Sequence, residues 1–164
     1  MASKAPHSKL VILDRDGVIN EDSDLYIKSP DEWLPIPGSL EAIAKLNQAG
    51  YHIAVATNQS GVGRGFYDMD MLNAIHEKFH RLLSKVGGHV DAIFFCPHTD
   101  ADKCNCRKPL PGMIHQISER YGIPIKGVPI VGDSVRDLVA GVAVGAEPHL
   151  VLTGKGEKAR ASGE

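Results

Sequence analysis

Short apolar segments alternate with amphipathic segments along most of the chain. The apolar segments are rich in β-branched residues and short enough to be buried strands. We expect five such strands, at residues 10–13, 51–56, 92–95, 128–131 and 149–152. Between them, apolar residues recur every three or four positions, which is the period of a helix with one buried face. This spacing predicts helices at residues 38–49, 68–86, 114–121 and 134–144.

The regular alternation of strands and helices indicates an α/β fold. Parallel strands need helical crossovers, so we expect a Rossmann-like doubly wound parallel sheet in a three-layer α/β/α arrangement. No insertion is long enough for a large cap domain. We expect one domain at residues 9–154, a flexible N-terminus at 1–8 and a frayed polar tail at 155–164. Because the chain stops soon after the fifth strand, a final helix is expected to be missing.

Composition and charge narrow the class of function. The 164 residues are 43% hydrophobic, and the formal net charge is -2. That balance offers no basic surface for DNA, RNA or an anionic membrane. No apolar run approaches the roughly 18 residues of a membrane span, and no apolar leader segment stands at the N-terminus. We therefore expect a cytoplasmic monomer with no nucleic-acid or membrane partner.

Two pairs of carboxylates follow predicted strands. Asp14 and Asp16 come directly after the first strand, and in extended backbone they face the same side. Their mutual repulsion favours a bound cation, and Mg²⁺ prefers such oxygen ligands. Asp133 follows the fourth strand and can complete the site, with Asp137 one helical turn further on. The alternatives are a plain acidic turn at the first pair and a helix N-cap at the second.

Candidate phosphate ligands follow the second strand and precede the third helix. The segment from Thr57 to Ser60 offers a hydroxyl, side-chain amides and free backbone N–H groups. Arg107 and Lys108 offer a guanidinium fork and a point charge. Each element alone is also compatible with an ordinary solvated loop. Their occurrence together after successive strands is more specific, because ligands of such sheets bind at the carboxyl ends of the strands.

In chain order these elements resemble the four signatures of the haloacid dehalogenase superfamily of aspartate-nucleophile phosphatases. The signatures stand here as Asp14-x-Asp16, Thr57, Lys108 and Gly132-Asp133-x-x-x-Asp137, and the resemblance extends over nearly the whole chain. It implies that Asp14 attacks phosphorus and forms an aspartyl-phosphate. It implies that Asp16 protonates the leaving oxygen and then activates water, while Thr57 and Lys108 neutralise the transferring phosphoryl group.

The resemblance also implies a catalytic Mg²⁺. Its ligands would be the side chains of Asp14 and Asp133 and the backbone carbonyl of Asp16, with Asp137 in a supporting position.

The three cysteines of the chain lie close together beside a histidine. Cys96, His98, Cys104 and Cys106 form a Cys-x-His-x5-Cys-x-Cys set. Three thiolates and one imidazole make a closed tetrahedral shell, which is typical of a structural Zn²⁺ site. The alternative is three buried free cysteines and a surface histidine. A zinc ion here would fix the loop at residues 96–106 that leads directly into Lys108.

The zinc loop and the run from Thr57 to Gly65 resemble one family within the superfamily, the heptose bisphosphate phosphatases. This resemblance implies removal of the C7 phosphate of D-glycero-D-manno-heptose 1,7-bisphosphate, in the supply of ADP-heptose for lipopolysaccharide. Candidate substrate-binding residues are those that this resemblance implies and those that flank its motifs. They are Asp22, Ser23, Asp24, Asn58, Gln59, Ser60, Arg64 and Arg107. The zinc loop is short, which leaves the anomer preference open. Ser134 stands where some relatives carry Lys, so a substrate contact from that Lys is absent or replaced.

Other functions share parts of this pattern. The same machinery serves for histidinol phosphate, another phosphosugar or a nucleic-acid 3′-phosphate, and the low positive charge weighs against the last. Two non-enzymatic alternatives are a phospho-accepting receiver domain and a zinc-centred interaction module. In a receiver the phosphate acceptor follows a later strand, whereas Asp14 and Asp16 follow the first. The remaining histidines, His76 among them, are interpreted as packed or solvated.

Overall fold

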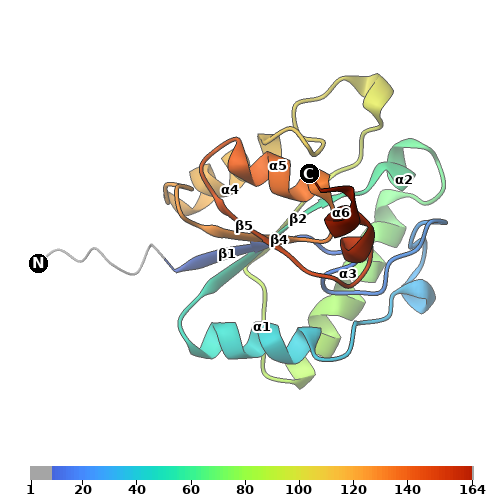
Figure 1. Ribbon diagram of the computed structural model, residues 1–164. Coiled ribbons are helices and arrows are strands. Elements are labelled where there is room, and N and C mark those ends of the chain that lie inside the picture. Colours follow the sequence, from blue (N-terminus) through green and yellow to red (C-terminus); the bar gives the residue numbers. More distant parts are fainter. Residues whose placement is uncertain (1–8, 164) are drawn as a thin grey trace, which may run out of the picture.

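The computed structural model describes residues 9–163, so the segment predicted to be flexible at 1–8 lies outside the described residues. Its strands form one parallel sheet in the order β3-β2-β1-β4-β5 (Figure 1). The strands are β1 (Leu10–Leu13), β2 (His52–Asn58), β3 (Ala92–Cys96), β4 (Pro129–Gly132) and β5 (Glu147–Leu150). The predicted parallel α/β fold is confirmed, and residues 9–163 contain no separate cap domain.

Helices cover both faces of the sheet and enclose two apolar cores. Figure 1 shows α1 and α3 on one side of the sheet and α4 and α5 on the other. Their bounds are α1 (Ser39–Gln48), α3 (Met69–Lys85), α4 (Gly112–Tyr121) and α5 (Val135–Val142). Along β1, Leu10 and Ile12 belong to one core while Val11 and Leu13 belong to the other. Both faces of β1 are therefore buried, which explains why this strand reads as an unbroken apolar run.

The last strand and the end of the chain differ from the sequence expectation. β5 begins two residues before the predicted segment because it pairs with β4 from Pro129↔Glu147 to Gly132↔Leu150. It is an edge strand with three exposed residues, so its apolar content does not mark its position. The tail expected to fray forms helix α6 (Gly156–Ser162) instead, and a short helix α2 (Ser60–Gly63) follows β2. Among residues 9–163 no helix is long and apolar enough to cross a membrane.

The strand order places a switch point between β1 and β4. The chain adds β2 and β3 on one side of β1 and then returns to add β4 and β5 on the other. The loops after β1 and β4 therefore diverge, and the space between them lies at the carboxyl ends of the strands. In open α/β sheets this crevice is where ligands bind. Asp14 and Asp133 each follow one of the two strands that border it.

Candidate active site

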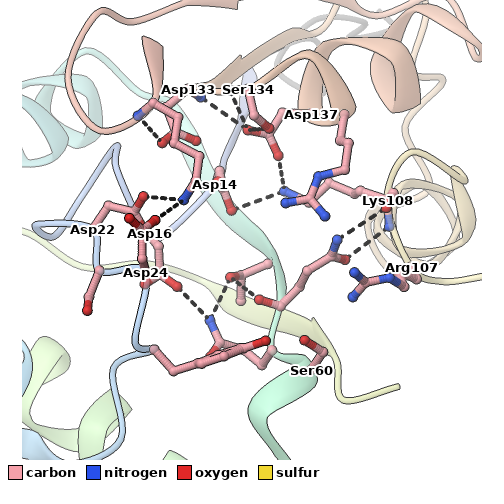
Figure 2. A pocket seen from close by; sticks show the side chains of 17 residues that line it. Asp14, Asp16, Asp22, Asp24, Ser60, Arg107, Lys108, Asp133, Ser134 and Asp137 are labelled. Carbon is pink, nitrogen blue, oxygen red and sulfur yellow. Dashed lines mark hydrogen bonds and ion pairs between the residues drawn. The ribbon is translucent and has the colours of Figure 1, made fainter. Parts of the chain in front are cut away.

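A polar cavity of about 290 Å³ lies at the carboxyl ends of β1, β2 and β4 (Figure 2). Of the residues predicted for catalysis, phosphate binding, sugar binding and magnesium, all but Arg64 line it. Arg64 is exposed at the end of α2 and is not among the lining residues. Four lining residues had no predicted role, and these are Tyr26, Ser134, Arg136 and Lys155.

Lys108 is the buried cation of the cavity. Its ammonium lies 3.0 Å from Asp14 Oδ1 and 2.7 Å from Asp137 Oδ1, and it donates to the Ala56 carbonyl at 2.8 Å. Burial alone would lower the pKa of Lys108, but the two carboxylates outweigh it and raise that pKa above its usual value. The side chain therefore remains charged and is fixed in position by three acceptors.

Asp14 lies beside this cation at the end of β1. Its backbone N–H donates to the Val131 carbonyl, which joins the loop after β1 to β4. Burial and the nearby charge of Asp137 raise the pKa of Asp14, although Lys108 opposes the shift. Carboxylate oxygens of Asp14, Asp133 and Asp137 lie within 4.8 Å of one another. One ammonium does not neutralise three such carboxylates, so the site favours a further cation.

Asp133 and Asp137 divide two tasks between them. One oxygen of Asp137 accepts from the Ser134 hydroxyl and from the backbone N–H groups of Asp133 and Ser134, which closes the N-terminus of α5. Its other oxygen contacts Lys108, so Asp137 is fully engaged without a metal. The helix-cap alternative from the sequence is thus also present, with Ser134 as the N-cap.

The carboxylate of Asp133, by contrast, is enclosed but accepts few hydrogen bonds. It accepts from the backbone N–H of Lys155 at 2.9 Å. Burial and the charge of Asp137 raise the pKa of Asp133 to about 6, against the Lys155 hydrogen bond. A Cβ added at Gly17 or Gly154 would lie 1.9 or 2.3 Å from Asp133 Oδ2, so only glycine fits on either side. Such a cradle around a carboxylate suits a hard cation such as Mg²⁺.

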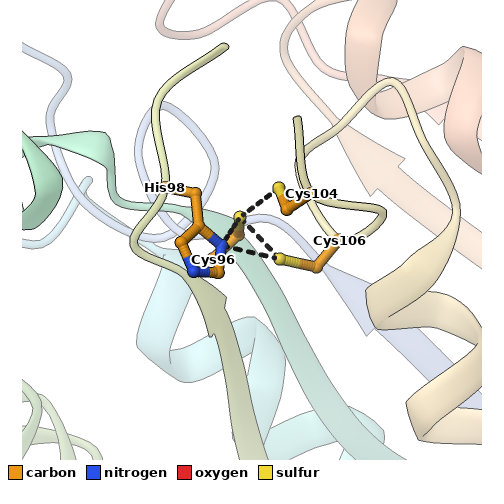
Figure 3. A group of neighbouring side chains, drawn as sticks. All are labelled: Cys96, His98, Cys104 and Cys106. Carbon is orange, nitrogen blue, oxygen red and sulfur yellow. Dashed lines mark hydrogen bonds between the residues drawn. The ribbon is translucent and has the colours of Figure 1, made fainter. Parts of the chain in front are cut away.

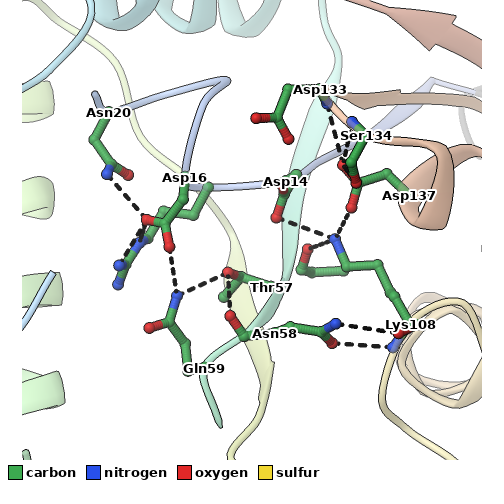
Figure 4. A network of polar contacts seen from close by, with 12 residues as sticks. Asp14, Asp16, Asn20, Thr57, Asn58, Gln59, Lys108, Asp133, Ser134 and Asp137 are labelled. Carbon is green, nitrogen blue, oxygen red and sulfur yellow. Dashed lines mark hydrogen bonds and ion pairs between the residues drawn. The ribbon is translucent and has the colours of Figure 1, made fainter. Parts of the chain in front are cut away.

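Asp16 is held by a separate set of donors (Figure 4). Its Oδ1 accepts from Arg15 Nε and from Asn20 Nδ2, both at 2.9 Å, and its Oδ2 accepts from Gln59 Nε2 at 3.3 Å. Burial would raise the pKa of Asp16, but the charge of Arg15 and these hydrogen bonds hold it below its usual value. The carboxylate is therefore ionised in this arrangement.

Gln59 connects Asp16 with the loop after β2. Its Nε2 donates to Thr57 Oγ1 at 2.9 Å, and its Oε1 accepts from the Tyr67 hydroxyl at 2.6 Å. The Tyr67 contact fixes the amide so that its N–H side faces Thr57 and Asp16. A Cβ at Gly61 would lie 2.2 Å from the Tyr67 ring, which explains the glycine in the turn that follows Ser60.

The side chains of Asn58 and Arg107 fix the segment that carries Lys108. The Asn58 side chain donates to the Lys108 carbonyl at 3.2 Å and accepts from the Lys108 N–H at 3.0 Å. Arg107 pairs with Asp100 at 2.7 Å and reaches the His98 carbonyl at 3.4 Å. Asn58, predicted for substrate binding, is thus occupied in joining β2 to the loop that carries Lys108.

The predicted zinc ligands are brought together (Figure 3). One ligand atom from each of Cys96, His98, Cys104 and Cys106 lies within 4.8 Å of the others. Burial opposes ionisation of Cys104, but backbone N–H groups of Arg107 and Cys106 outweigh it and lower the Cys104 pKa to about 6. This donor set of three sulfurs and Nδ1 fits a closed structural Zn²⁺ shell. It lies directly before Arg107 and Lys108 in the chain.

An acidic rim completes the cavity. Asp22, Ser23 and Asp24 line it as predicted, and the Lys155 ammonium pairs with Asp22 and lies 4.0 Å from Asp24. Thr153 donates to the Gly17 carbonyl at 2.7 Å and so fixes the segment before α6 against the loop after β1. Lys155 was missed because it lies in a polar stretch that the sequence marks only as a tail. The two glycines that flank Lys155, at positions 154 and 156, were the one available signal.

The chain is similar to known proteins of one hydrolase family. A model of the haloacid dehalogenase-like hydrolases matches residues 7–145. The chain is 59% identical over 155 residues to a D-glycero-beta-D-manno-heptose-1,7-bisphosphate 7-phosphatase from Bordetella bronchiseptica, covering 94% of this chain and 87% of that one. It is 58% identical over 150 residues to the protein of the same name from Neisseria meningitidis, covering 92% and 80%.

Two solved structures are also similar. The D,D-heptose 1,7-bisphosphate phosphatase of B. bronchiseptica, complexed with magnesium and phosphate, matches with a TM-score of 0.93 at 58% identity. That match covers 94% of this chain and 86% of the other. The corresponding protein from Burkholderia thailandensis matches with a TM-score of 0.74 at 55% identity, covering 94% and 84%.

Proposed function

Because the chain belongs to the haloacid dehalogenase-like hydrolase family, we propose that it is a magnesium-dependent sugar-bisphosphate phosphatase. Its substrate is D-glycero-β-D-manno-heptose 1,7-bisphosphate, from which it removes the C7 phosphate. The observation that carries the proposal is the Asp14–Lys108–Asp137 network beside Asp133, at the switch point of a chain 59% identical to a phosphatase of that name. The β anomer follows from the names of these relatives.

Asp14 is the nucleophile in this proposal. Its carboxylate attacks phosphorus, a new bond forms from Asp14 to phosphorus, and the bond from phosphorus to the C7 oxygen breaks. Lys108 and Thr57 balance the charge on the equatorial oxygens, where stabilisation matters most in phosphoryl transfer. Lys108 is suited to this because Asp137 and the Ala56 carbonyl already orient its ammonium.

Asp16 handles the protons in both steps. It donates a proton to the departing C7 oxygen and then removes one from the water that hydrolyses the aspartyl-phosphate. The low pKa of Asp16 favours the ionised form, which the second step uses. A substrate phosphate beside Asp16 adds negative charge, which favours the protonated form that the first step needs.

Asp14 and Asp133 would hold the Mg²⁺ ion, with the Asp16 backbone carbonyl, while Asp137 supports the site through Lys108. The close carboxylates and the glycine cradle of Asp133 fit such an ion. When bound, Mg²⁺ offsets the repulsion between the anionic nucleophile and the anionic phosphate. Asp14 in particular must remain ionised in spite of its burial.

A structural Zn²⁺ at Cys96, His98, Cys104 and Cys106 is the second metal of the proposal. Its task is to fix the loop whose end carries Arg107 and Lys108. Arg107 would then bind the phosphate that does not react, since its fork suits a bidentate contact. The acidic rim at Asp22 and Asp24 would accept hydrogen bonds from sugar hydroxyls.

The proposal also concerns where and in what form the enzyme acts. The cavity of a single chain already contains the proposed nucleophile, acid–base group and metal-binding carboxylates, so the reaction needs no residue from a second chain and we take the enzyme to be a monomer. A sugar bisphosphate is too strongly charged to cross a membrane unaided, which supports a cytoplasmic enzyme.

Phosphate release with Mg²⁺ tests the substrate directly. The substrates are the α and β anomers of heptose 1,7-bisphosphate and histidinol phosphate. We expect kcat/KM for the β anomer to exceed that for histidinol phosphate by about a hundredfold or more, which is about 2.7 kcal/mol of transition-state binding. Equal values for all three substrates would contradict the substrate assignment. A preference for histidinol phosphate would mean that the enzyme uses the same chemistry on that substrate instead.

A further inference from the structure

Arg15 is a fully buried cation that no proposed catalytic step uses. Its guanidinium has no exposed surface and lies between Asp16 and His76. On one side, Nε donates to Asp16 Oδ1 at 2.9 Å and Nη2 lies 2.7 Å from the same oxygen. On the other side, Nη1 lies 3.1 Å from Nε2 of His76. A guanidinium is costly to bury unless its donors find acceptors, so both contacts need an explanation.

Only one protonation state of His76 is consistent with this contact. Arginine offers only donors, so Nε2 of His76 must accept, and the imidazole must be neutral with its proton on Nδ1. A protonated imidazole would place two cations 3.1 Å apart without an acceptor between them. Burial and the charge of Arg15 lower the pKa of His76 to about 3, which agrees with the neutral form.

His76 is itself rigidly mounted. It lies in α3, on the same buried face as Leu72, Ile75 and Phe79, and only 8% of its surface is exposed. The imidazole therefore has a fixed position relative to the core. Without an acceptor there, Nη1 would be a buried donor with no partner, and the guanidinium would turn to find one. Such a turn would withdraw the fork from Asp16.

We infer that His76 is a positioning residue for phosphate transfer, which holds the Arg15 fork on Asp16 and so fixes the carboxylate that exchanges protons with the leaving group. The inference rests on the proposed function, because Asp16 is given its role there. Asn20 and Gln59 also contact Asp16, but neither carries a charge. His76 thus links the core of α3 to the acid–base group through one buried cation.

The test is the leaving-group dependence of kcat/KM in variants of the metal-loaded enzyme, because kcat/KM reports the steps up to the aspartyl-phosphate and not its hydrolysis. An alkyl phosphate such as the heptose bisphosphate needs a proton on the departing oxygen, whereas p-nitrophenyl phosphate releases a stable anion and needs none. His76→Leu removes the acceptor at similar volume. His76→Gln keeps a carbonyl acceptor close to the position of Nε2. His80→Leu, on an exposed position one turn along α3, is the matched control.

We expect His76→Leu to lower kcat/KM for the alkyl phosphate about tenfold while changing kcat/KM for p-nitrophenyl phosphate less than about threefold. His76→Gln and His80→Leu should keep the wild-type ratio of the two kcat/KM values. An equal fall for both substrates, or a Gln variant no better than Leu, would show that His76 only supports the fold. If His76→Leu does not fold, Arg15→Lys takes its place, because it keeps the charge and loses the fork. An unchanged ratio in that variant overturns the inference.

Asp16→Asn distinguishes failure of the acid role of Asp16 from failure of the positioning role of His76. It should lower kcat/KM for the alkyl phosphate about 10²- to 10⁴-fold and affect kcat/KM for p-nitrophenyl phosphate less. If Asp16→Asn shows no leaving-group dependence, the acid role of Asp16 fails and the His76 inference falls with it. If Asp16→Asn shows the dependence and His76→Leu does not, only the inference about His76 is overturned.

Discussion

The two sides of the cavity are built differently. On the side of Lys108, the ammonium contacts two ionisable carboxyl groups, and the side-chain exposures are 4%, 12% and 5% for Lys108, Asp14 and Asp137. On the side of the acidic rim, the Lys155 side chain is 42% exposed and its distant partner Asp24 is 94% exposed. Buried, hydrogen-bonded charges keep their geometry, whereas exposed pairs contribute little and rearrange readily.

This difference separates the groups proposed to act on phosphorus from those proposed to recognise the substrate. The groups proposed to act on phosphorus are fixed before any substrate arrives, since each has backbone or buried partners. The groups proposed to contact the sugar, Asp22 and Asp24, lie on the loop after β1, where small changes cost little stability. We therefore expect substitutions on the buried side to affect kcat and those on the rim to affect KM. The following predictions test this contrast, beginning with the largest effect.

Asp14→Asn should abolish turnover, by about 10⁴-fold or more in kcat, because the amide is a poor nucleophile. It should not lower the melting temperature, since the neutral side chain removes the repulsion between Asp14 and Asp137. Phosphate release and thermal unfolding are the two measurements. Near-normal kcat in the folded variant would refute the nucleophile assignment.

Lys108→Met should cost both activity and stability. It leaves Asp137 and Asp14 buried without their cation, so we expect the free energy of unfolding to fall by about 3–5 kcal/mol. The kcat should fall about 10²- to 10³-fold, because a fixed positive charge is lost from the transferring phosphoryl group. Denaturant unfolding and steady-state kinetics measure the two effects.

The double variant Lys108→Met with Asp137→Asn is the control for this prediction. It removes one buried uncompensated charge, so part of the stability should return while kcat stays low. Recovery of kcat together with stability would mean that Lys108 acts only through the fold.

Cys104→Ser should remove the bound zinc and lower kcat about tenfold, less than the changes in the buried network. The zinc shell touches no substrate in this account, and it acts by fixing the loop that leads to Lys108. Metal content by mass spectrometry and the melting temperature report the loss. Asn105→Ser, on an exposed position between two of the ligands, is the matched control and should change neither. Wild-type protein that holds no zinc when purified would refute the metal loop.

Lys155→Met should have the smallest effect, raising KM about two- to fivefold with little change in kcat. Its side chain pairs with Asp22 on the rim, whereas its backbone N–H, which contacts Asp133, is kept in the variant. Lys158→Met on the exposed part of α6 is the control and should leave KM unchanged. A fall in kcat with constant KM would place Lys155 on the reaction side instead.

Much of this arrangement could be predicted from local sequence. β1 is an unbroken apolar run because both its faces are buried, and Asp68 caps α3 as its position before the helix indicates. Asp14 and Asp133 follow strands and Thr57 lies near the end of β2, so a parallel sheet was sufficient to bring them to one edge. The four side chains proposed to bind zinc could be grouped from their spacing because they lie close together in the chain, and the structure brings them together.

What the sequence could not show depends on contacts between distant segments. Arg15 and His76 are 61 positions apart, and neither position has a pattern that pairs it with the other. β5 is held by its register with β4 and not by apolar content. Lys155 joins the site because Thr153 and Lys155 contact Gly17 and Asp133, more than 20 positions away along the chain. Local periodicity contains no information about such contacts.

The central claim is that Asp14 forms a covalent bond to phosphorus. The most direct measurement is to quench the enzyme in acid during turnover of heptose 1,7-bisphosphate, reduce it with borohydride and analyse its peptides by mass spectrometry. An aspartyl-phosphate at Asp14 is reduced to homoserine, so the account predicts homoserine at position 14 only in the presence of substrate and Mg²⁺. Homoserine at another aspartate would contradict this prediction. So would an Asp14 that stays intact while the enzyme releases phosphate and accumulates no acyl-phosphate.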